Sequence, residues 1–344
     1  MKLSNTNLIA RPARARTVPP VAMCLEVLPV ILEDEGVRSM ASNNLIRLSD
    51  MVFNFMLQYP DSPRVIAATL HSIVLLARPI GQKEGSLFES NMMNGLIEIS
   101  DTGYGSGSKP ERLHGIIIIY NTMEKFKDNA RIMAMACWSL VNISLVDRHK
   151  CILMQLGGVR RALDAIERHS EDTELTYRAL FCLINFVVPT ERAMKWSESE
   201  KKVLRVVLGE DASKWDEKAT LRESMQDIVS VTVKCMNLYI NNTNIVNRGC
   251  LILHNLSLLP GGCAMQLLTP GCVAVLRKTY KLYTDNARVR QALEGTLQML
   301  YDSLQNDRNL MRKFDAMSAE DLGYVRGSGG YNPPTSAAPD HAGD

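Results

Sequence analysis

Three asparagines near the ends of apolar stretches are the residues whose type and spacing could do chemistry in this sequence: Asn142, Asn185 and Asn255. An Asn side chain offers one carbonyl acceptor and one NH₂ donor group, which match the N–H and C=O groups of an extended peptide. Repeated at intervals, such side chains could bind a peptide backbone while their neighbours select the ligand sequence. The residues four positions earlier, in the same order, are Trp138, Phe181 and Leu251. The opposite interpretation, in which the amides only hydrogen-bond adjacent helices, fits the sequence equally well.

The common motifs of catalytic centres do not occur in the sequence. There is no Gly-x-Ser-x-Gly, no His-Glu-x-x-His and no dinucleotide-binding Gly-x-Gly-x-x-Gly. The glycine-rich stretch 103–109 ends in a lysine, but Pro110 follows it instead of the helix start that a phosphate-binding loop requires. His71 and His254 have no partners at metal-binding spacing. We therefore expect a non-enzymatic protein with no cofactor and no metal.

The asparagines belong to a helical pattern that recurs along the chain. When the stretches are aligned on Asn142, aliphatic residues recur two and ten positions before it, on nearly the same side of an α-helix. Two further stretches keep this phase, and Asp-Asn-Ala-Arg opens both the Asn142 and the Met299 stretch. The five aligned positions, which we call anchors, are Leu75, Asn142, Asn185, Asn255 and Met299. The aliphatic pairs are Val65 and Ile73, Ile132 and Leu140, Leu175 and Leu183, Ile245 and Leu253, and Val289 and Leu297.

The anchors are 67, 43, 70 and 44 residues apart. The two short spacings fit one helical repeat of the armadillo or HEAT kind, which is about 40–47 residues long. Each long spacing contains a stretch that reads as an insertion, at residues 81–110 and 190–220. The spacings therefore fit one repeat that keeps its phase.

The stretch from Asn129-Ala130-Arg131 through Cys137-Trp138-Ser139-Leu140-Val141-Asn142 to Gln155-Leu156-Gly157-Gly158-Val159 resembles the armadillo repeat of β-catenin and importin-α. The resemblance implies that the helix with Trp138 and Asn142 is the third of its unit and lines a concave groove. It also implies a sharp turn between the first and second helices at Gly157-Gly158 and, more loosely, at Pro270-Gly271. We therefore predict an all-α fold, a right-handed α-solenoid of about four to five armadillo/HEAT-like repeats.

Composition narrows the classes of partner and compartment. The net charge is only +2, which does not favour nucleic acid. The eight cysteines form no Cys-x-x-Cys pair, and several lie in apolar helical runs, so we expect free thiols in a reducing compartment, the cytoplasm. No apolar run reaches the ~18–20 residues of a membrane span.

The chain divides into three parts in this interpretation. Residues 1–20 form a basic arm without acidic residues, residues 21–317 the repeat domain, and residues 326–344 a tail rich in Gly, Ser, Pro and Ala that we expect to be disordered. The arm has the composition of a mitochondrial presequence, which is the alternative localisation. Within the first insertion and after it, we expect helices at Leu87–Ile99 and Arg112–Phe126.

The sequence favours a protein–protein interaction scaffold, or adaptor, that binds an extended protein segment in the concave groove. The groove residues would be Trp138, Asn142, Phe181, Asn185, Leu251 and Asn255. Two alternatives stay open: a structural subunit of a larger assembly, mitochondrial if residues 1–20 are a presequence, and an RNA-binding helical repeat protein.

Overall fold

The computed structural model describes residues 18–40, 42–80, 84–94, 97–99, 111–188, 190, 201, 205, 215–259 and 263–305. The chain forms two compact units, Met1–Ile143 with Trp196–Glu210, and Ser144–Lys195 with Asp211–Asp344. We call them unit 1 and unit 2 and describe each by itself.

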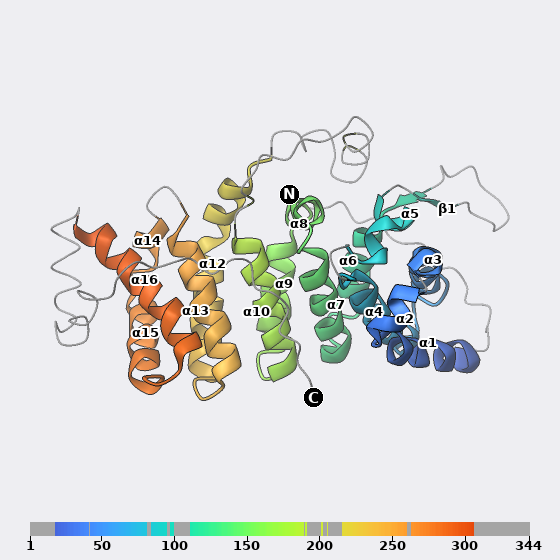
Figure 1. Cartoon of the computed structure of the whole chain (residues 1–344). Helices are drawn as coiled ribbons and strands as arrows, with labels where there is room; N and C mark the ends of the chain where they lie inside the picture. Colours follow the sequence, from blue (N-terminus) through green and yellow to red (C-terminus); the bar gives the residue numbers. More distant parts are fainter. Residues whose placement is uncertain are drawn as a thin grey trace. The chain divides into compact units, whose positions relative to one another are not determined.

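Unit 1 contains seven of the labelled α-helices, a 3₁₀ helix and two short strands (Figure 1). Its elements are α1 (Val18–Leu32), α2 (Glu35–Met40), α3 (Ser42–Gln58), α4 (Pro63–Ala77), η1 (Ser86–Glu89), α5 (Asn91–Asn94), β1 (Ile97–Ile99), β2 (Glu111–Leu113), α6 (Gly115–Lys125) and α7 (Ala130–Ile143). Helix α4 packs against α1 on one side and α7 on the other. Every third long helix of the unit thus packs on its equivalent.

Unit 2 repeats this arrangement (Figure 1). Its elements are α8 (Asp147–Gln155), α9 (Gly158–Arg168), α10 (Thr173–Val187), α12 (Glu217–Leu238), α13 (Thr243–Ser257), α14 (Cys263–Gln266), α15 (Pro270–Leu282) and α16 (Ala287–Gln305). Helix α13 packs between α10 and α16. The five anchors lie on α4, α7, α10, α13 and α16, so the predicted all-α fold of stacked helical repeats is confirmed.

The apolar face that defines the repeat is the face that is buried. In all five anchored helices the aliphatic residues two and ten positions before the anchor are buried; nine of these ten side chains are 0–1% exposed, and Leu297 is 8% exposed. Burying aliphatic side chains between neighbouring helices is the main favourable term for such a stack. The predicted phase is therefore correct in every anchored helix.

The five anchored helices also begin in the same way. Thirteen positions before each anchor stands a short polar residue whose side-chain oxygen accepts a hydrogen bond from the backbone N–H three residues later, which satisfies an orphan donor of the first turn. These residues are Ser62, Asn129, Asp172, Asn242 and Asn286, with N–H···O distances of 3.5, 3.1, 2.8, 3.3 and 3.1 Å. The common cap fixes where each helix starts relative to its anchor.

The expected sharp turn between α8 and α9 is present. Gly157 has φ +81°, in the left-handed region that favours glycine. Its N–H donates to the Met154 carbonyl at the end of α8. Pro270 opens α15 after the short helix α14, with Thr269 as the N-cap. Both turns lie where the resemblance places them.

The prediction of one helix over Leu87–Ile99 is wrong. The segment forms η1, α5 and then β1, which pairs with β2 in antiparallel register, Ile97 opposite Leu113 and Ile99 opposite Glu111. The predicted helix Arg112–Phe126 correspondingly begins only at Gly115. Ile97-Glu98-Ile99 alternates apolar and charged residues, which is the period of a strand. This two-stranded pair is the only sheet in the described residues.

Candidate functional site

Within each unit, residues four positions before the anchors lie half-buried on one face of the anchored helices, which we call the ladder face of that unit. In unit 1 it contains His71 of α4 and Trp138 of α7; in unit 2 it contains Phe181 of α10 and Leu251 of α13. In α16 the same position is Gly295, where an added Cβ would lie 2.7 Å from His254 Cε1. His254 is 1% exposed and burial lowers its pKa, so a neutral imidazole fills the place of a ladder side chain.

Trp138 makes its contacts within unit 1. Its ring stacks on His71 with centroids 5.7 Å apart and the planes 29° apart. The guanidinium carbon of Arg78 lies 5.6 Å from the ring centroid, and Arg78 Nη1 also pairs with Glu33 Oε1 at 2.9 Å. The chain itself therefore supplies the cation that an aromatic face attracts.

Phe181 has an equivalent partner in unit 2. Arg248 of α13 is 5% exposed, and its guanidinium carbon lies 3.9 Å from the Phe181 ring centroid and 5.1 Å from that of Tyr177. Arg248 Nη2 also donates to the Tyr177 hydroxyl at 2.8 Å. These contacts join α10 to α13 through a buried cation between aromatic side chains.

The side-chain amide of Asn142 forms a hydrogen bond to another helix of unit 1. Its Nδ2 donates to the Val74 carbonyl of α4 at 2.9 Å, and the residue is 6% exposed. Val74 lies in the last turn of α4, where the N–H of Arg78 turns back to Leu75 and leaves the Val74 carbonyl without a helical donor. Asn142 therefore satisfies a backbone carbonyl at the end of the preceding anchored helix.

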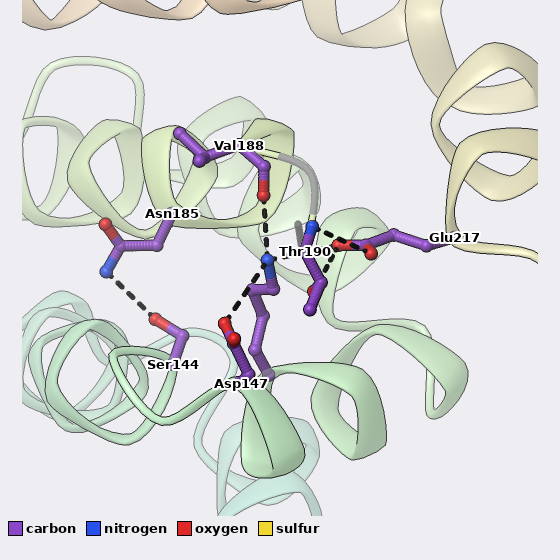
Figure 2. A network of polar contacts seen from close by, with 7 residues as sticks. Ser144, Asp147, Asn185, Val188, Thr190 and Glu217 are labelled. Carbon is purple, nitrogen blue, oxygen red and sulfur yellow. Dashed lines mark hydrogen bonds and ion pairs between the residues drawn. The ribbon is translucent and has the colours of Figure 1, made fainter. Parts of the chain in front are cut away.

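Asn185 and Asn255 lie in unit 2 and are half-buried. Asn185 Nδ2 donates to the Ser144 hydroxyl at 3.0 Å, as Figure 2 shows. The side chain of Asn255 has no hydrogen bond to the residues that the structure describes. Of the two interpretations open in the sequence, hydrogen bonding within the fold is the one observed for Asn142 and Asn185.

A buried polar network lies beside Asn185 (Figure 2). Lys150 of α8 is 3% exposed; its Nζ donates to the Val188 carbonyl at 2.7 Å and pairs with Glu217 Oε1 at 3.1 Å. Glu217 in turn accepts from the N–H and the hydroxyl of Thr190, at 3.1 and 3.3 Å. Glu217 therefore joins the first turn of α12 to Thr190, near the two ends of the predicted insertion at 190–220, and it also pairs with the buried Lys150.

Unit 1 contains a cleft of about 450 Å³ beside its ladder face, between α1, α4 and α7. Its apolar lining comes from Pro29, Pro63, Ala67, Ala68, Ile132 and Met135, and its polar lining from Glu26, Arg64, His71, Asn129 and Arg131. Glu26 and Arg64 form a two-fold hydrogen-bonded ion pair, with distances of 2.9 and 2.8 Å. The hydrogen bond from Arg64 lowers the pKa of Glu26, which keeps this carboxyl ionised. A volume of this size falls within the range of binding sites for small ligands or side chains.

The structure places the six sequence-predicted residues in two groups. Trp138 and Asn142 lie in unit 1, and Phe181, Asn185, Leu251 and Asn255 in unit 2. Sequence reasoning missed Arg248 and Lys150 because their partners lie far along the chain: Phe181 and Glu217 are each 67 residues away, and Val188 is 38 residues away. It also passed over Arg64 and Arg131, although both stand eleven positions before an anchor, a signal that the alignment contains.

The described residues contain no group of three or more His, Cys, Asp or Glu that could hold a metal ion. None of their helices is long and apolar enough to cross a membrane. All eight cysteines are free, and Cys24 alone among them is exposed.

Successive three-helix units with a shared anchored helix define the fold. It is a stacked α-helical repeat. No family model matches the chain, and neither does any curated protein. The solved structures similar to the chain include two engineered proteins. One is a designed armadillo repeat protein, in complex with the peptide (KR)4, at 12% identity and TM-score 0.46, over 83% of this chain and 95% of that chain. The other is an engineered protein of the Northeast Structural Genomics Consortium, at 14% identity and TM-score 0.43, over 80% of this chain and 98% of that chain.

Proposed function

We propose that the protein is a non-enzymatic scaffold that binds an extended segment of a protein partner on the ladder face of its units. The observation that carries this proposal is the cleft of about 450 Å³ in unit 1, beside His71 and lined by apolar and charged side chains from α1, α4 and α7. A surface that offers apolar pockets and charged groups along parallel helices suits an extended chain, whose side chains alternate in direction. The free thiols suit a reducing compartment, and we place the protein in the cytoplasm.

We assign recognition to partly accessible groups of the ladder face and leave the amides of Asn142 and Asn185 to the fold. Ala67 in unit 1 and Asn247 in unit 2 both stand eight positions before an anchor and are half-buried. Phe181, Leu251 and Asn255 keep part of their surface accessible in unit 2. Many weak contacts of this kind must add up, because a single satisfied hydrogen bond contributes only about 0.5–1.5 kcal/mol.

Site-specific photo-crosslinking tests the proposal. A photoreactive amino acid would replace Ala67 or Asn247 on the ladder face, or Arg47 of α3 or Glu167 of α9 as exposed control positions outside it. We expect the two ladder variants to form adducts in cells, with mass spectrometry mapping each adduct to one short contiguous segment of a partner. The controls should form few. Equal adducts at all four positions, or none at the ladder positions in variants with normal helicity, would contradict the proposal.

A further inference from the structure

The cleft of unit 1 has an excess of positive charge at the place where a ligand would enter. Of its lining residues, Glu26 is neutralised by Arg64, whose side chain is 60% exposed beside it. Arg131 of α7 is also exposed. Its charge acts on Glu26, whose pKa is lowered by the hydrogen bond from Arg64 and more weakly by Arg131, but no salt bridge joins Arg131 to a carboxylate among the described residues. After internal pairing, one guanidinium at the rim of the cleft therefore keeps its donors available for a carboxylate.

Helix starts strengthen this positive potential. Arg64 and Arg131 are each the second residue after the N-cap of an anchored helix, following Ser62 and Asn129. The N-terminus of an α-helix carries about half a positive elementary charge, and a cation in the first turn is unfavourable by about 0.3–1 kcal/mol. Arg64 is stabilised at its helix start by the two-fold hydrogen-bonded ion pair with Glu26, whereas Arg131 has no such pair. Arg131 is therefore the arginine of this cleft whose charge a ligand carboxylate would compensate.

Arg78, a further cation of the unit 1 ladder face, makes this face unfavourable for a basic ligand. Arg78 lies over the Trp138 ring, where a ligand lysine would otherwise be attracted. A second cation brought to that ring would meet Arg78 and, further along the face, Arg64 and Arg131. The apolar lining from Ile132, Met135 and Ala67 favours amino-acid side chains over a phosphate backbone.

We propose that the cleft of unit 1 selects acidic segments: an extended peptide that places an apolar side chain among Ala67, Ile132 and Met135 and a neighbouring carboxylate on Arg131. This specificity rests on the proposed function and names the chemistry of the partner. Charge-assisted hydrogen bonds from a guanidinium to a carboxylate are short and fork-shaped, so Arg131 supplies direction as well as charge. Arg64, held by Glu26, adds to the field without leaving its pair.

Fluorescence anisotropy with the full chain tests the specificity. The probes are two labelled dodecapeptides, one alternating Leu and Glu and one alternating Leu and Lys, together with a labelled oligouridylate of twelve nucleotides. We expect the Leu-Glu peptide to bind at least about tenfold more tightly than either other probe. The variant Arg131→Glu should weaken its binding about tenfold or more. Arg131→Glu removes a cation from a helix start and should fold at least as well as the parent.

The matched control is Arg47→Glu, which makes the same charge change at an exposed position of α3 outside the cleft and should leave the affinity unchanged. Equal binding of the two peptides, or an acidic preference that survives Arg131→Glu, would overturn the inference. So would oligouridylate binding that depends on Arg131 while the peptides do not bind. If crosslinking at Ala67 maps protein segments but these probes show no acidic preference, the specificity fails and the scaffold function stands; if neither experiment detects a peptide, both fail.

Discussion

The substitution Asn142→Ala separates a structural from a ligand-binding role for the best-matched residue of the repeat. Its Nδ2 donates to the Val74 carbonyl at 2.9 Å in a site that is 6% exposed. Alanine removes the donor and leaves a buried carbonyl at the end of α4 unsatisfied, which costs about 1–3 kcal/mol. We therefore expect the free energy of unfolding of unit 1 to fall by this amount and its melting temperature by about 3–10 °C.

Urea and thermal unfolding, followed by circular dichroism at the helical band, measure this loss. Asn255→Ala is the matched control, because this half-buried anchor makes no side-chain hydrogen bond to the described residues, and it should change stability by no more than about 0.5 kcal/mol. Asn142→Asp should cost more than Asn142→Ala, because it turns an oxygen in place of the NH₂ group toward the Val74 carbonyl. If Asn142→Ala keeps the parent's stability, the hydrogen bond to Val74 is not what retains this asparagine, and the reasoning is refuted.

Two further predictions concern unit 2. Lys150→Met should lower the free energy of unfolding by about 3–5 kcal/mol, because the Lys150 and Glu217 side chains are only 4% and 12% exposed and Glu217 would lose its buried cation. In urea unfolding, adding Glu217→Gln to Lys150→Met should recover part of the loss. If Lys150→Met alone is as stable as the parent, the prediction is wrong. Burial raises the pKa of Cys235, Cys250 and Cys272 to about 12 from an ordinary value of 9.0, so the folded thiols keep protons that the unfolded chain releases. The free energy of unfolding should therefore not depend on these thiols below about pH 9 and should fall between pH 9 and 12. Urea midpoints of the parent at pH 8, 9 and 10.5 test this, and Cys250→Ala should make the decline shallower. A parent midpoint that does not change between pH 9 and 10.5 would count against the prediction.

The anchored helices could be predicted from the sequence because their signal is local. Pairs such as Ile132 and Leu140 stand eight apart on one helical face, and burial between neighbouring helices requires only that face. The N-caps could be predicted equally well. Asn129 and Asn286 are the second residues of the two copies of Asp-Asn-Ala-Arg, and each accepts a hydrogen bond from the backbone N–H three residues later. Apolar residues at helical spacing predict the helix, and the short polar residue before them predicts where it begins.

The contacts of the ladder face could not be predicted, because they depend on which helix lies alongside. Asn142 bonds a carbonyl 68 residues earlier, and Arg248 stacks on an aromatic side chain of α10. The segment Leu87–Ile99 failed for a different reason. Short apolar stretches there fit a helix and a strand alike, and the pairing of β1 with β2 decides between them through a partner beyond the local sequence.

If the proposed function is correct, the C-terminal ends of the anchored helices contribute to stability and the N-terminal end of α7 to recognition. At the C-terminal ends, donors from neighbouring helices satisfy orphan carbonyls: Asn142 bonds Val74, and Lys150 bonds Val188. At the N-terminal ends of α4 and α7, Ser62 and Asn129 cap the helices, and Arg64 pairs with Glu26 of α1, so Arg131 is the first-turn arginine that the fold does not use in this way. Substitutions at the C-terminal donors should therefore reduce stability, whereas substitution of Arg131 should change binding and leave stability intact. Observing both effects in one residue would mean that the two ends are not independent, and the assignment of recognition to the N-terminal end of α7 would fail.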